Sequence, residues 1–343
     1  MDSLKKLNVG VVGIGRIGQR HALNILNNTP RANLLCACST AEPDLIWGKK
    51  HLSPYGVKLF DSFEDMIKMP GLEAVVIASI SALHMPHTIA ALERGNSYLI
   101  ERVEAKPETK LMVGFTRRFD ESYQDARLKI QEGKIGKPTI VRSQGCERVD
   151  TSPFFRNYLK NSGGIFIDAI VHDIDLALLF FGEESRPKSV SAAGVAAIHT
   201  ELSEVGDADN AVGICEFWGG KIAFFYNSRM AAHGYDNMTE IFGTRGKLSI
   251  NLTPRQNQVE MCDSDGYIKT EPTTSWYDRY KTAFVMELVM WVDALDEKPM
   301  PIPLRSSLTG LIIANALQES LRTDQRIRFE RDGKRKDSAA DLS

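Results

Sequence analysis

A short apolar segment of the chain carries carboxylate and imidazole side chains at helical spacing. In the run SGGIFIDAIVHDIDLALLFFG, the residues at positions i, i+4 and i+7 are Asp168, His172 and Asp175, and this spacing predicts one face of a helix. A buried polar stripe is costly unless its groups are paired or used in chemistry. We expect Asp173 to point away from this face and to be solvated.

These side chains can remove a proton from an alcohol. An imidazole with a pKa of about 6.5 can accept the hydroxyl proton while a hydride leaves the same carbon. A carboxylate one helical turn away can orient the ring, so His172 is the candidate acid/base and Asp168 its orienting partner. The alternative is an Asp–His pair that only caps or bridges elements of the fold.

A second segment has the pattern G-x-G-x-x-G, formed by Gly13, Ile14, Gly15, Arg16, Ile17 and Gly18. It follows an apolar strand and opens a helix, which is the context in which this pattern binds a dinucleotide. Gly13 permits the tight turn, Gly15 the approach of the pyrophosphate, and Gly18 the close packing of helix on strand. The free N–H groups of the helix face the phosphates. The alternative is a glycine-rich turn without a ligand.

The end of the second predicted strand bears on the type of dinucleotide. This strand ends in ACSTAEPD, where Ser39 occupies the place at which NAD-binding folds usually carry an acid for the ribose hydroxyls. Glu42 comes slightly later. Without a carboxylate at this place a 2′-phosphate meets no repulsion, and Arg16, or Lys49 and Lys50, can pair with it. We therefore expect NAD or NADP, with NADP favoured.

The elements that must position these segments alternate along the first third of the chain. Strands are predicted at 7–13, 32–39, 57–60, 73–79 and 97–101, and helices at 16–28, 62–69 and 85–95, with Pro86 near the start of the last helix. This alternation is typical of a doubly wound parallel sheet. A further strand is predicted at 111–115. Only nine residues separate Glu101 from Leu111, whereas a parallel crossover usually takes a dozen or more, so one helix is missing.

The pattern changes in the rest of the chain. A helix at 120–133 precedes predicted hairpins at 214–228, 239–252 and 258–272, and two amphipathic helices follow at 280–295 and 307–322. We predict a Rossmann dinucleotide-binding domain over 1–118, an α+β domain with an open, mostly antiparallel sheet over 119–330, and a polar, disordered tail over 331–343. Strand alternation places aromatic side chains on both faces of the second sheet, which predicts a homo-oligomer, a dimer or tetramer, joined through residues 139–270.

Composition excludes several classes of partner. A net charge of −2 over 343 residues gives no electrostatic case for nucleic acid or for an anionic membrane. The apolar runs are shorter than the roughly 18 residues of a membrane span. The first residues lead into a strand and not into a cleavage site, so we expect a cytoplasmic protein. The five cysteines are scattered without a metal-binding spacing, so we expect reduced thiols and no metal.

With these motifs in place, the chain resembles the glucose–fructose oxidoreductase/inositol 2-dehydrogenase/MocA family over residues 8–329. The resemblance lies in VGVVGIGRIGQRHA, SISALHMPHTIAALERG, LMVGFTRRFD, SGGIFIDAIVHDID and TEIFGTRGKL. It implies the fold described above and NAD(P)-linked oxidation of a polyol, sugar or related cyclic alcohol. It also implies that Asp168 and His172 are catalytic and contact the substrate together with Arg117. The segment 78–81, with Ala78, Ser79 and Ile80, is expected to border the nicotinamide.

The chain departs from the family at one motif. Members carry Glu-Lys-Pro and then a helix, and the lysine shuttles a proton. Here Glu101, expected at the cofactor, is followed by Arg102 and Val103, and a guanidinium stays protonated. Lys106, in EAKP, is a substitute candidate. We expect cofactor binding with slow oxidation of inositols and sugars. The alternative is a non-redox member, such as a ligand or cofactor sensor, that keeps the scaffold.

Overall fold

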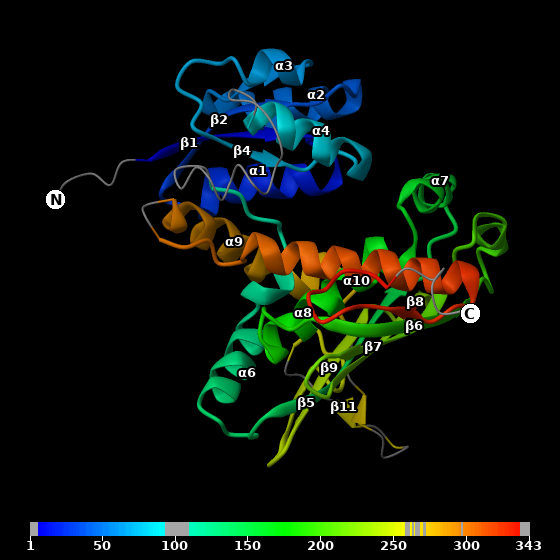
Figure 1. The fold of residues 1–343 in the computed structure, drawn as a ribbon. Helices are drawn as coiled ribbons and strands as arrows, with labels where there is room; N and C mark the ends of the chain where they lie inside the picture. Colours follow the sequence, from blue (N-terminus) through cyan, green and yellow to red (C-terminus); the bar gives the residue numbers. More distant parts are fainter. Residues whose placement is uncertain are drawn as a thin grey trace. The chain divides into compact units, whose positions relative to one another are not determined.

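The structure of the protein is a computed structural model, and it describes residues 6–92, 110–257, 261–262, 264, 268–269, 272–295 and 298–336. The chain packs as two compact units, one of Met1–Gly114 with Thr282–Leu304 and one of Phe115–Lys281 with Arg305–Ser343 (Figure 1). The division expected at residue 118 places 282–304 in the second domain, whereas the structure returns this segment to the first unit. The helix α9 (Trp276–Ala294) belongs to both units, and its backbone leaves helical geometry at Tyr280.

The first unit is a parallel sheet with helices on both faces. Its strands run in the order β3-β2-β1-β4, and every neighbouring pair is parallel. The strands are β1 (Leu7–Val12), β2 (Ala32–Cys38), β3 (Lys58–Phe60) and β4 (Ala74–Ile77). The helices are α1 (Arg16–Asn28), α2 (Glu42–His51), α3 (Phe63–Met66) and α4 (Ser81–Leu92). The expected doubly wound parallel sheet is confirmed.

Alternating side chains of β1 separate two apolar layers of the first unit. Val9 packs with Ile25 of α1 on one face of the sheet, and Val12 packs with Phe63 of α3 on the other. Leu288 of α9 belongs to the first of these layers. Because α9 fills part of this layer, the returning segment is needed to cover the sheet. The sequence pattern did not predict this, since an amphipathic helix does not reveal which sheet its apolar face covers.

Two expectations about the β4 edge of this sheet are wrong. The helix α4 begins at Ser81, so Pro86 lies inside it and not near its start. Residues 110–115 form no strand in the part of the chain that the structure describes. A strand needs a hydrogen-bonded neighbour, and the nine residues before Leu111 are too few for the usual crossover helix. The predicted strand at 97–101 lies outside the described residues.

The second unit is built on a seven-stranded sheet in the order β10-β9-β5-β8-β7-β6-β13. Its strands are β5 (Pro138–Arg148), β6 (Pro187–Val195), β7 (Asn210–Phe217), β8 (Lys221–Ala231), β9 (Asp236–Gly243), β10 (Lys247–Ile250) and β13 (Ile327–Arg328). All pairs are antiparallel except β5 with β8, which confirms the mostly antiparallel sheet. A separate pair joins β11 (Met261–Cys262) to β12 (Ile268–Lys269).

Turn chemistry explains the hairpin that leaves β7 and enters β8. Phe217 pairs with Lys221, and both Gly219 and Gly220 have left-handed backbones, with φ of 92° and 84°. Side chains other than glycine rarely adopt two such conformations in succession. The predicted turn is therefore confirmed.

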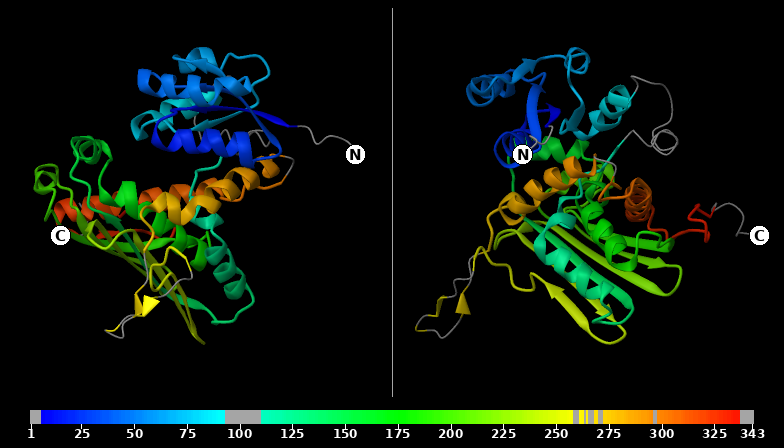
Figure 2. Two further views of the ribbon diagram at one scale, coloured as in Figure 1. Left: turned by 180° about the vertical axis from the view of Figure 1, so that it is seen from behind. Right: turned by 90° about the vertical axis from the view of Figure 1, so that its left-hand side faces the viewer.

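Helices cover one face of this second sheet, and the other face is open (Figure 2). The helices of the unit are α6 (Glu121–Gln131), α7 (Pro153–Asn161), α8 (Val171–Phe181) and α10 (Leu304–Thr323). The α8 helix packs against β5 and β8, and Ser320 of α10 accepts a hydrogen bond from the Ala192 amide of β6. The open face carries five large apolar side chains that are 36–45% exposed, namely Ile140, Val212, Ile214, Ile222 and Phe242.

The first part of the predicted disordered tail is ordered. Phe329 pairs with Arg335 across a turn, and the guanidinium of Arg335 donates two hydrogen bonds of 2.7 Å to Glu319 of α10. Residues 331–336 are therefore fixed to the second unit, because a paired backbone and a bidentate ion pair offset their polar composition. The remainder of the tail, 337–343, lies outside the described residues.

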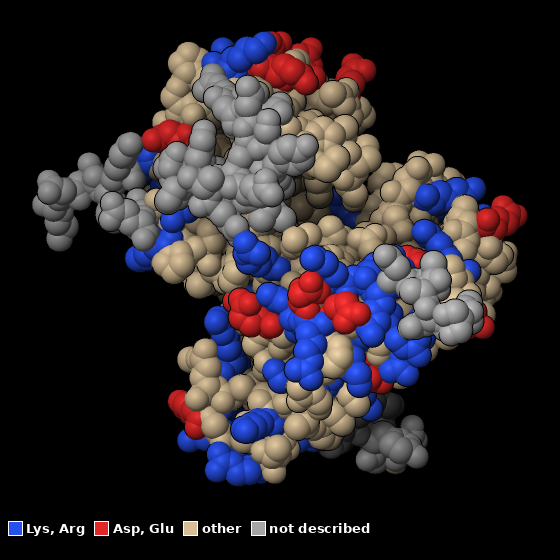
Figure 3. All heavy atoms as spheres, viewed as in Figure 1, with Lys and Arg blue, Asp and Glu red and all other residues tan. Residues whose placement is uncertain are grey.

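Cationic side chains gather on one face of the second unit, where acidic side chains lie among them (Figure 3). The ion pairs of the second unit include Arg335 with Glu319 and Arg326 with Glu216. Interleaved charges of opposite sign produce a weaker long-range field than a uniform basic patch. Among the described helices, none has the length and apolar character needed to cross a membrane.

Candidate active site

The glycine segment forms the turn between β1 and α1, and two of its glycines are required by the protein's own backbone. Gly13 has a left-handed backbone with φ of 85°, and a Cβ atom there would lie 2.4 Å from the Ser79 amide nitrogen. A Cβ atom on Gly18 would lie 1.9 Å from the Gly13 carbonyl oxygen. The turn, the helix and the segment after β4 therefore approach one another too closely for any side chain at these two positions.

Gly15 differs from the other two glycines because nothing in the described part of the chain crowds it. Among the described residues, a Cβ atom on Gly15 would meet one neighbour within 4 Å, the Asp44 carboxylate oxygen Oδ2 at 3.8 Å. Gly15 is the N-cap of α1, and no side chain of the described residues caps this helix end. A bare helix N-terminus behind an open glycine is the cradle that a pyrophosphate needs. The residues present therefore fit a dinucleotide.

The segment that follows β4 lies against this turn. Ala78 donates a backbone hydrogen bond to Val12 at the end of β1, and the Ser79 backbone is the neighbour that crowds Gly13. The Ser79 hydroxyl lies 3.0 Å from Nδ1 of His87, and Nε2 of His84 lies 2.7 Å from the Ser79 carbonyl oxygen. Sequence reasoning missed both histidines, although their i, i+3 spacing on α4 places them near each other.

The candidate base His172 lies in the first turn of α8 and is partly buried. Its ring meets the Phe115 ring edge-on, with 5.8 Å between centroids. Burial, together with the nearby Arg117 charge, lowers the pKa of His172 to about 3. The expected ordinary imidazole pKa is therefore wrong, since an apolar surrounding and a cation both disfavour the charged ring. The ring is neutral at physiological pH and can accept a proton.

Asp168 precedes His172 in a π-helical turn, Phe166–Ile170. One carboxylate oxygen accepts a hydrogen bond from the Tyr158 hydroxyl, and the other accepts one of 2.7 Å from Nη2 of Arg229. No hydrogen bond joins Asp168 to His172 in the described part of the chain, which differs from the predicted orienting role. A π-turn closes i→i+5 hydrogen bonds, so the extra residue rotates Asp168 away from the position that i, i+4 spacing predicts.

Arg229 and Tyr158 hold this carboxylate from two sides. Arg229, on β8, is 1% exposed and also lies 3.7 Å from a carboxylate oxygen of Asp207. Burial and the neighbouring Asp168 raise the pKa of the Tyr158 phenol, so Tyr158 stays protonated and donates. The sequence did not predict Arg229, Tyr158 or Asp207 as site residues, because they come from separate elements and match no local motif.

Asp173 is buried, although the sequence predicted a solvated side chain. Its side chain is 1% exposed, and Oδ1 accepts hydrogen bonds of 2.6 Å from Nη1 of Arg117 and from the Ser143 hydroxyl. Arg117, predicted at the substrate, is thus held by Asp173. Asp173 faces the sheet because α8 packs against β5, which contributes Ser143.

Asp175 forms a buried ion pair with Arg118 and has a structural role. Arg118 donates two hydrogen bonds of 2.7 Å to its carboxylate and a third, of 3.1 Å, to the Ser306 hydroxyl. Burial raises the pKa of Asp175 to about 6, and the Arg118 charge opposes that shift. Of the three predicted face residues, only Asp168 and His172 are available to a ligand.

Two residues predicted for the site belong to the segment between Leu92 and Lys110. Glu101 and Lys106 lie outside the described residues, as does the position of Arg102. The described residues contain no cluster of three or more His, Cys, Asp or Glu side chains that could hold a metal ion.

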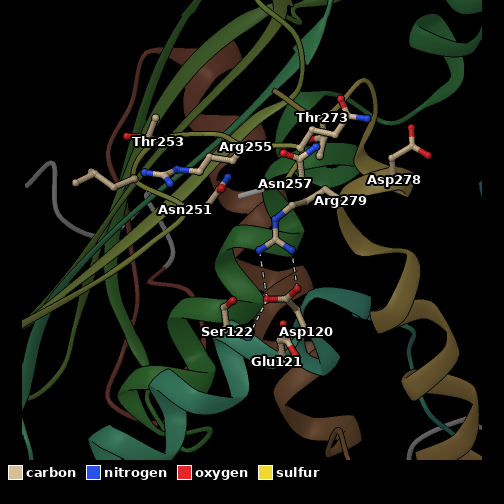
Figure 4. Close-up of a pocket in the computed structure, with 12 residues that line it drawn as sticks. Asp120, Glu121, Ser122, Asn251, Thr253, Arg255, Asn257, Thr273, Asp278 and Arg279 are labelled. Atoms are coloured by element: carbon tan, nitrogen blue, oxygen red, sulfur yellow. Dashed lines mark hydrogen bonds and ion pairs between the residues drawn. The ribbon is translucent and has the colours of Figure 1, made fainter. Parts of the chain in front are cut away.

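A polar cavity of about 640 Å³ also opens in the second unit, next to the start of α6. Figure 4 shows Arg279 pointing at Asp120, with which it forms hydrogen bonds of 2.6 and 3.3 Å. Because the cation and the acid satisfy each other, this cavity presents no uncompensated charge from that pair to a ligand.

The fold and these residues define a dinucleotide-binding oxidoreductase with a Rossmann unit and an α+β unit. Comparison with known families agrees. Residues 7–103 match the oxidoreductase family with an NAD-binding Rossmann fold, and residues 123–249 match the GFO/IDH/MocA C-terminal domain. The chain belongs to the GFO/IDH/MocA family, as predicted, and its cofactor is a nicotinamide dinucleotide.

Several relatives of known activity are similar to the chain over almost its whole length. Myo-inositol 2-dehydrogenase of Thermotoga maritima is 28% identical over 94% of this chain and 99% of its own. The scyllo-inositol 2-dehydrogenase (NAD(+)) of Bacillus subtilis is 29% identical over 87% of this chain and 88% of its own. The crystal structure of scyllo-inositol dehydrogenase from Lactobacillus casei, with bound NAD(H) and scyllo-inositol, has a TM-score of 0.86 and 31% identity, covering 94% of this chain and 99% of that one.

Proposed function

We propose that this oxidoreductase transfers a hydride between a nicotinamide dinucleotide and one CH–OH group of a cyclic polyol of the inositol type. The observations that carry this proposal are the carboxylate of Asp168, which a buried guanidinium and a phenol hold in place, and the neutral imidazole of His172, four residues further along the chain. Alternating donors and acceptors of this kind suit a substrate with several neighbouring hydroxyl groups. The cytoplasmic location expected from the sequence is proposed together with this function.

The roles of the residues follow from their protonation states. In the oxidation direction, a ring nitrogen of His172 accepts the hydroxyl proton while the carbon–hydrogen bond breaks, so the alcohol becomes a ketone. Asp168, fixed by Arg229 and Tyr158, accepts a hydrogen bond from a second hydroxyl and orients the ring of the polyol. The dinucleotide, when bound, supplies the hydride acceptor.

The low pKa of His172 predicts an unusual pH profile. Because kcat/KM reports groups in the free enzyme, a ring with a pKa of about 3 stays neutral, and able to accept a proton, between about pH 5 and pH 8. We expect kcat/KM for inositol oxidation to show no loss in this range that is due to His172. Initial rates across this range measure it. An acid limb with a midpoint near that of an ordinary imidazole, absent from His172→Gln, would contradict this assignment.

The homo-oligomer predicted from the sequence is proposed to form through the open sheet face. Five large apolar side chains share this face, and a contiguous exposed patch of this kind marks an interface. We expect light scattering at micromolar concentration to give a multiple of the 38.2 kDa chain mass.

A matched pair of variants tests the face itself. Ile214→Glu places a charge on the open face and should yield monomers, whereas Ile46→Glu, on the 58% exposed Ile46 of α2, should leave the mass unchanged. A monomeric wild type, or an oligomer that survives Ile214→Glu combined with Ile222→Glu, would count against this interface.

A further inference from the structure

A carboxylate from α2 is held close to the end of β2, although the strand itself ends without an acid. Ser39 is 7% exposed, and its hydroxyl donates a hydrogen bond of 2.7 Å to Oδ2 of Asp44 while accepting one from the Ala41 amide. Asp44 lies in the first turn of α2, five residues after Ser39. Ser39 stands where this fold usually has an acid, and its hydroxyl binds the carboxylate of Asp44. The turn into α2 therefore brings an acid back to the end of β2.

The same carboxylate also lies beside the glycine turn. Of the atoms that the structure describes, Asp44 Oδ2 is the one within 4 Å of the position that a Cβ atom of Gly15 would occupy. Within the described residues, Ser39 is the side chain that hydrogen-bonds to this carboxylate, and no cation forms an ion pair with it. Asp44 thus keeps acceptor capacity and a negative charge next to the place where Gly15 admits a dinucleotide.

We propose that Asp44 sets the cofactor preference of this enzyme, by accepting hydrogen bonds from the adenosine ribose hydroxyls of NAD(H) and by repelling the 2′-phosphate of NADP(H). Acids near the end of the second strand bind the ribose diol in this class of fold. A phosphate brings about −1.5 to −2 charges to the same place. This inference rests on the dinucleotide binding in the proposed function, and it reverses the preference for NADP that the sequence favoured.

The cationic residues predicted from the sequence to bind a 2′-phosphate do not change this preference for NAD(H). Lys49 and Lys50 occupy the last turn of α2, roughly 8 Å along the helix axis from Asp44. They lie away from the helix end that adjoins the glycine turn. Arg16 is exposed in the first turn of α1, and it becomes the candidate partner of a phosphate only when the Asp44 charge is removed.

Fluorescence titration of NADH and NADPH tests the proposal without measuring turnover. We expect wild type to bind NADH at least tenfold more tightly than NADPH. Asp44→Ser should weaken the binding of NADH about ten- to hundredfold, as expected for loss of hydrogen bonds to a charged group. The same substitution should strengthen the binding of NADPH. Asp44→Asn retains an acceptor for Ser39, so it should keep the thermal midpoint of unfolding. It should reduce the preference for NADH over NADPH. The matched control is Glu42→Gln, which removes the charge of an exposed acid on the same helix turn. It should change the binding of neither NADH nor NADPH.

The outcomes separate this inference from the proposed function. Equal or tighter binding of NADPH by wild type would overturn the inference and leave the proposed function standing. Equal weakening of both dinucleotides in Asp44→Ser, restored for both by Asp44→Asn, would also overturn it, since it would show that Asp44 only supports α2. Binding of neither dinucleotide by wild type would contradict the inference and the proposed function together.

Discussion

Gly15→Val is expected to abolish dinucleotide binding without unfolding the protein. Among the described residues, a Cβ atom at Gly15 meets only Asp44 Oδ2, 3.8 Å away, so the branched side chain occupies the space over the helix N-terminus where a pyrophosphate would lie. Titration with NADH should show no saturation up to millimolar concentration. The thermal midpoint should stay within a few degrees of wild type, since surface changes usually cost about 0.5 kcal/mol or less.

Two other glycines provide the controls for this experiment. Gly18→Ala places a Cβ atom 1.9 Å from the Gly13 carbonyl oxygen, so it should destabilise the first unit itself. Gly310→Ala, on α10, finds its nearest neighbours at 3.8 and 3.9 Å and should leave binding unchanged. If Gly15→Val binds NADH as wild type does, the glycine turn is not the cofactor site.

Restoring the missing Glu-Lys-Pro segment is expected to raise turnover by about 10²-fold or more. General acid–base assistance is typically worth about 10²–10⁴-fold, and the low pKa of His172 makes this ring a weak base without a partner. Among the described residues, 110–115 form no strand, and the nine residues between Glu101 and Leu111 are fewer than a parallel crossover usually takes. Replacement of Arg102 by Lys-Pro and a crossover helix from a family member, between Glu101 and Val103, completes the Glu-Lys-Pro motif with Glu101 and supplies both the lysine and the helix.

A single substitution separates the lysine from the backbone that positions it. Arg102→Lys should recover little, because small misplacements at a reacting centre can cost about 10²-fold. Steady-state rates with inositol measure both variants. Full recovery by Arg102→Lys alone would contradict the requirement for the helix. A wild-type turnover within the ordinary range of about 1–10³ per second would remove the need for restoration and would make Lys106 the leading candidate for the second base.

Local sequence signals predicted the parts of this protein that depend on neighbouring residues. The glycine turn, the helix that follows it and the Gly219-Gly220 hairpin all rest on backbone conformations that few residue types allow. The parallel sheet followed from the alternation of strands and helices, and the antiparallel sheet followed from strand-like runs joined by turn residues. None of these features requires knowledge of distant contacts.

The errors lie where distant segments meet or where helical geometry is irregular. Asp173 was expected in solvent, but Arg117 and Ser143 are brought to it by tertiary packing. Asp168 was expected to orient His172, but the π-turn changes the helical phase. Asp44 was overlooked because it stands six residues beyond the end of β2, and only the turn into α2 returns it to Ser39.

Transfer of deuterium in a single turnover tests the central proposal most directly. Purified protein is mixed with NAD⁺ and inositol that carries deuterium on its carbinol carbons, and the reduced nicotinamide is analysed by mass spectrometry. We predict that deuterium appears in the nicotinamide, at a rate below about 1 per second, that His172→Ala lowers this rate by about 10²-fold or more, and that Gly15→Val abolishes it. Transfer that is absent from wild type, or that is equally fast in His172→Ala, would contradict the proposed oxidation of a polyol by this site.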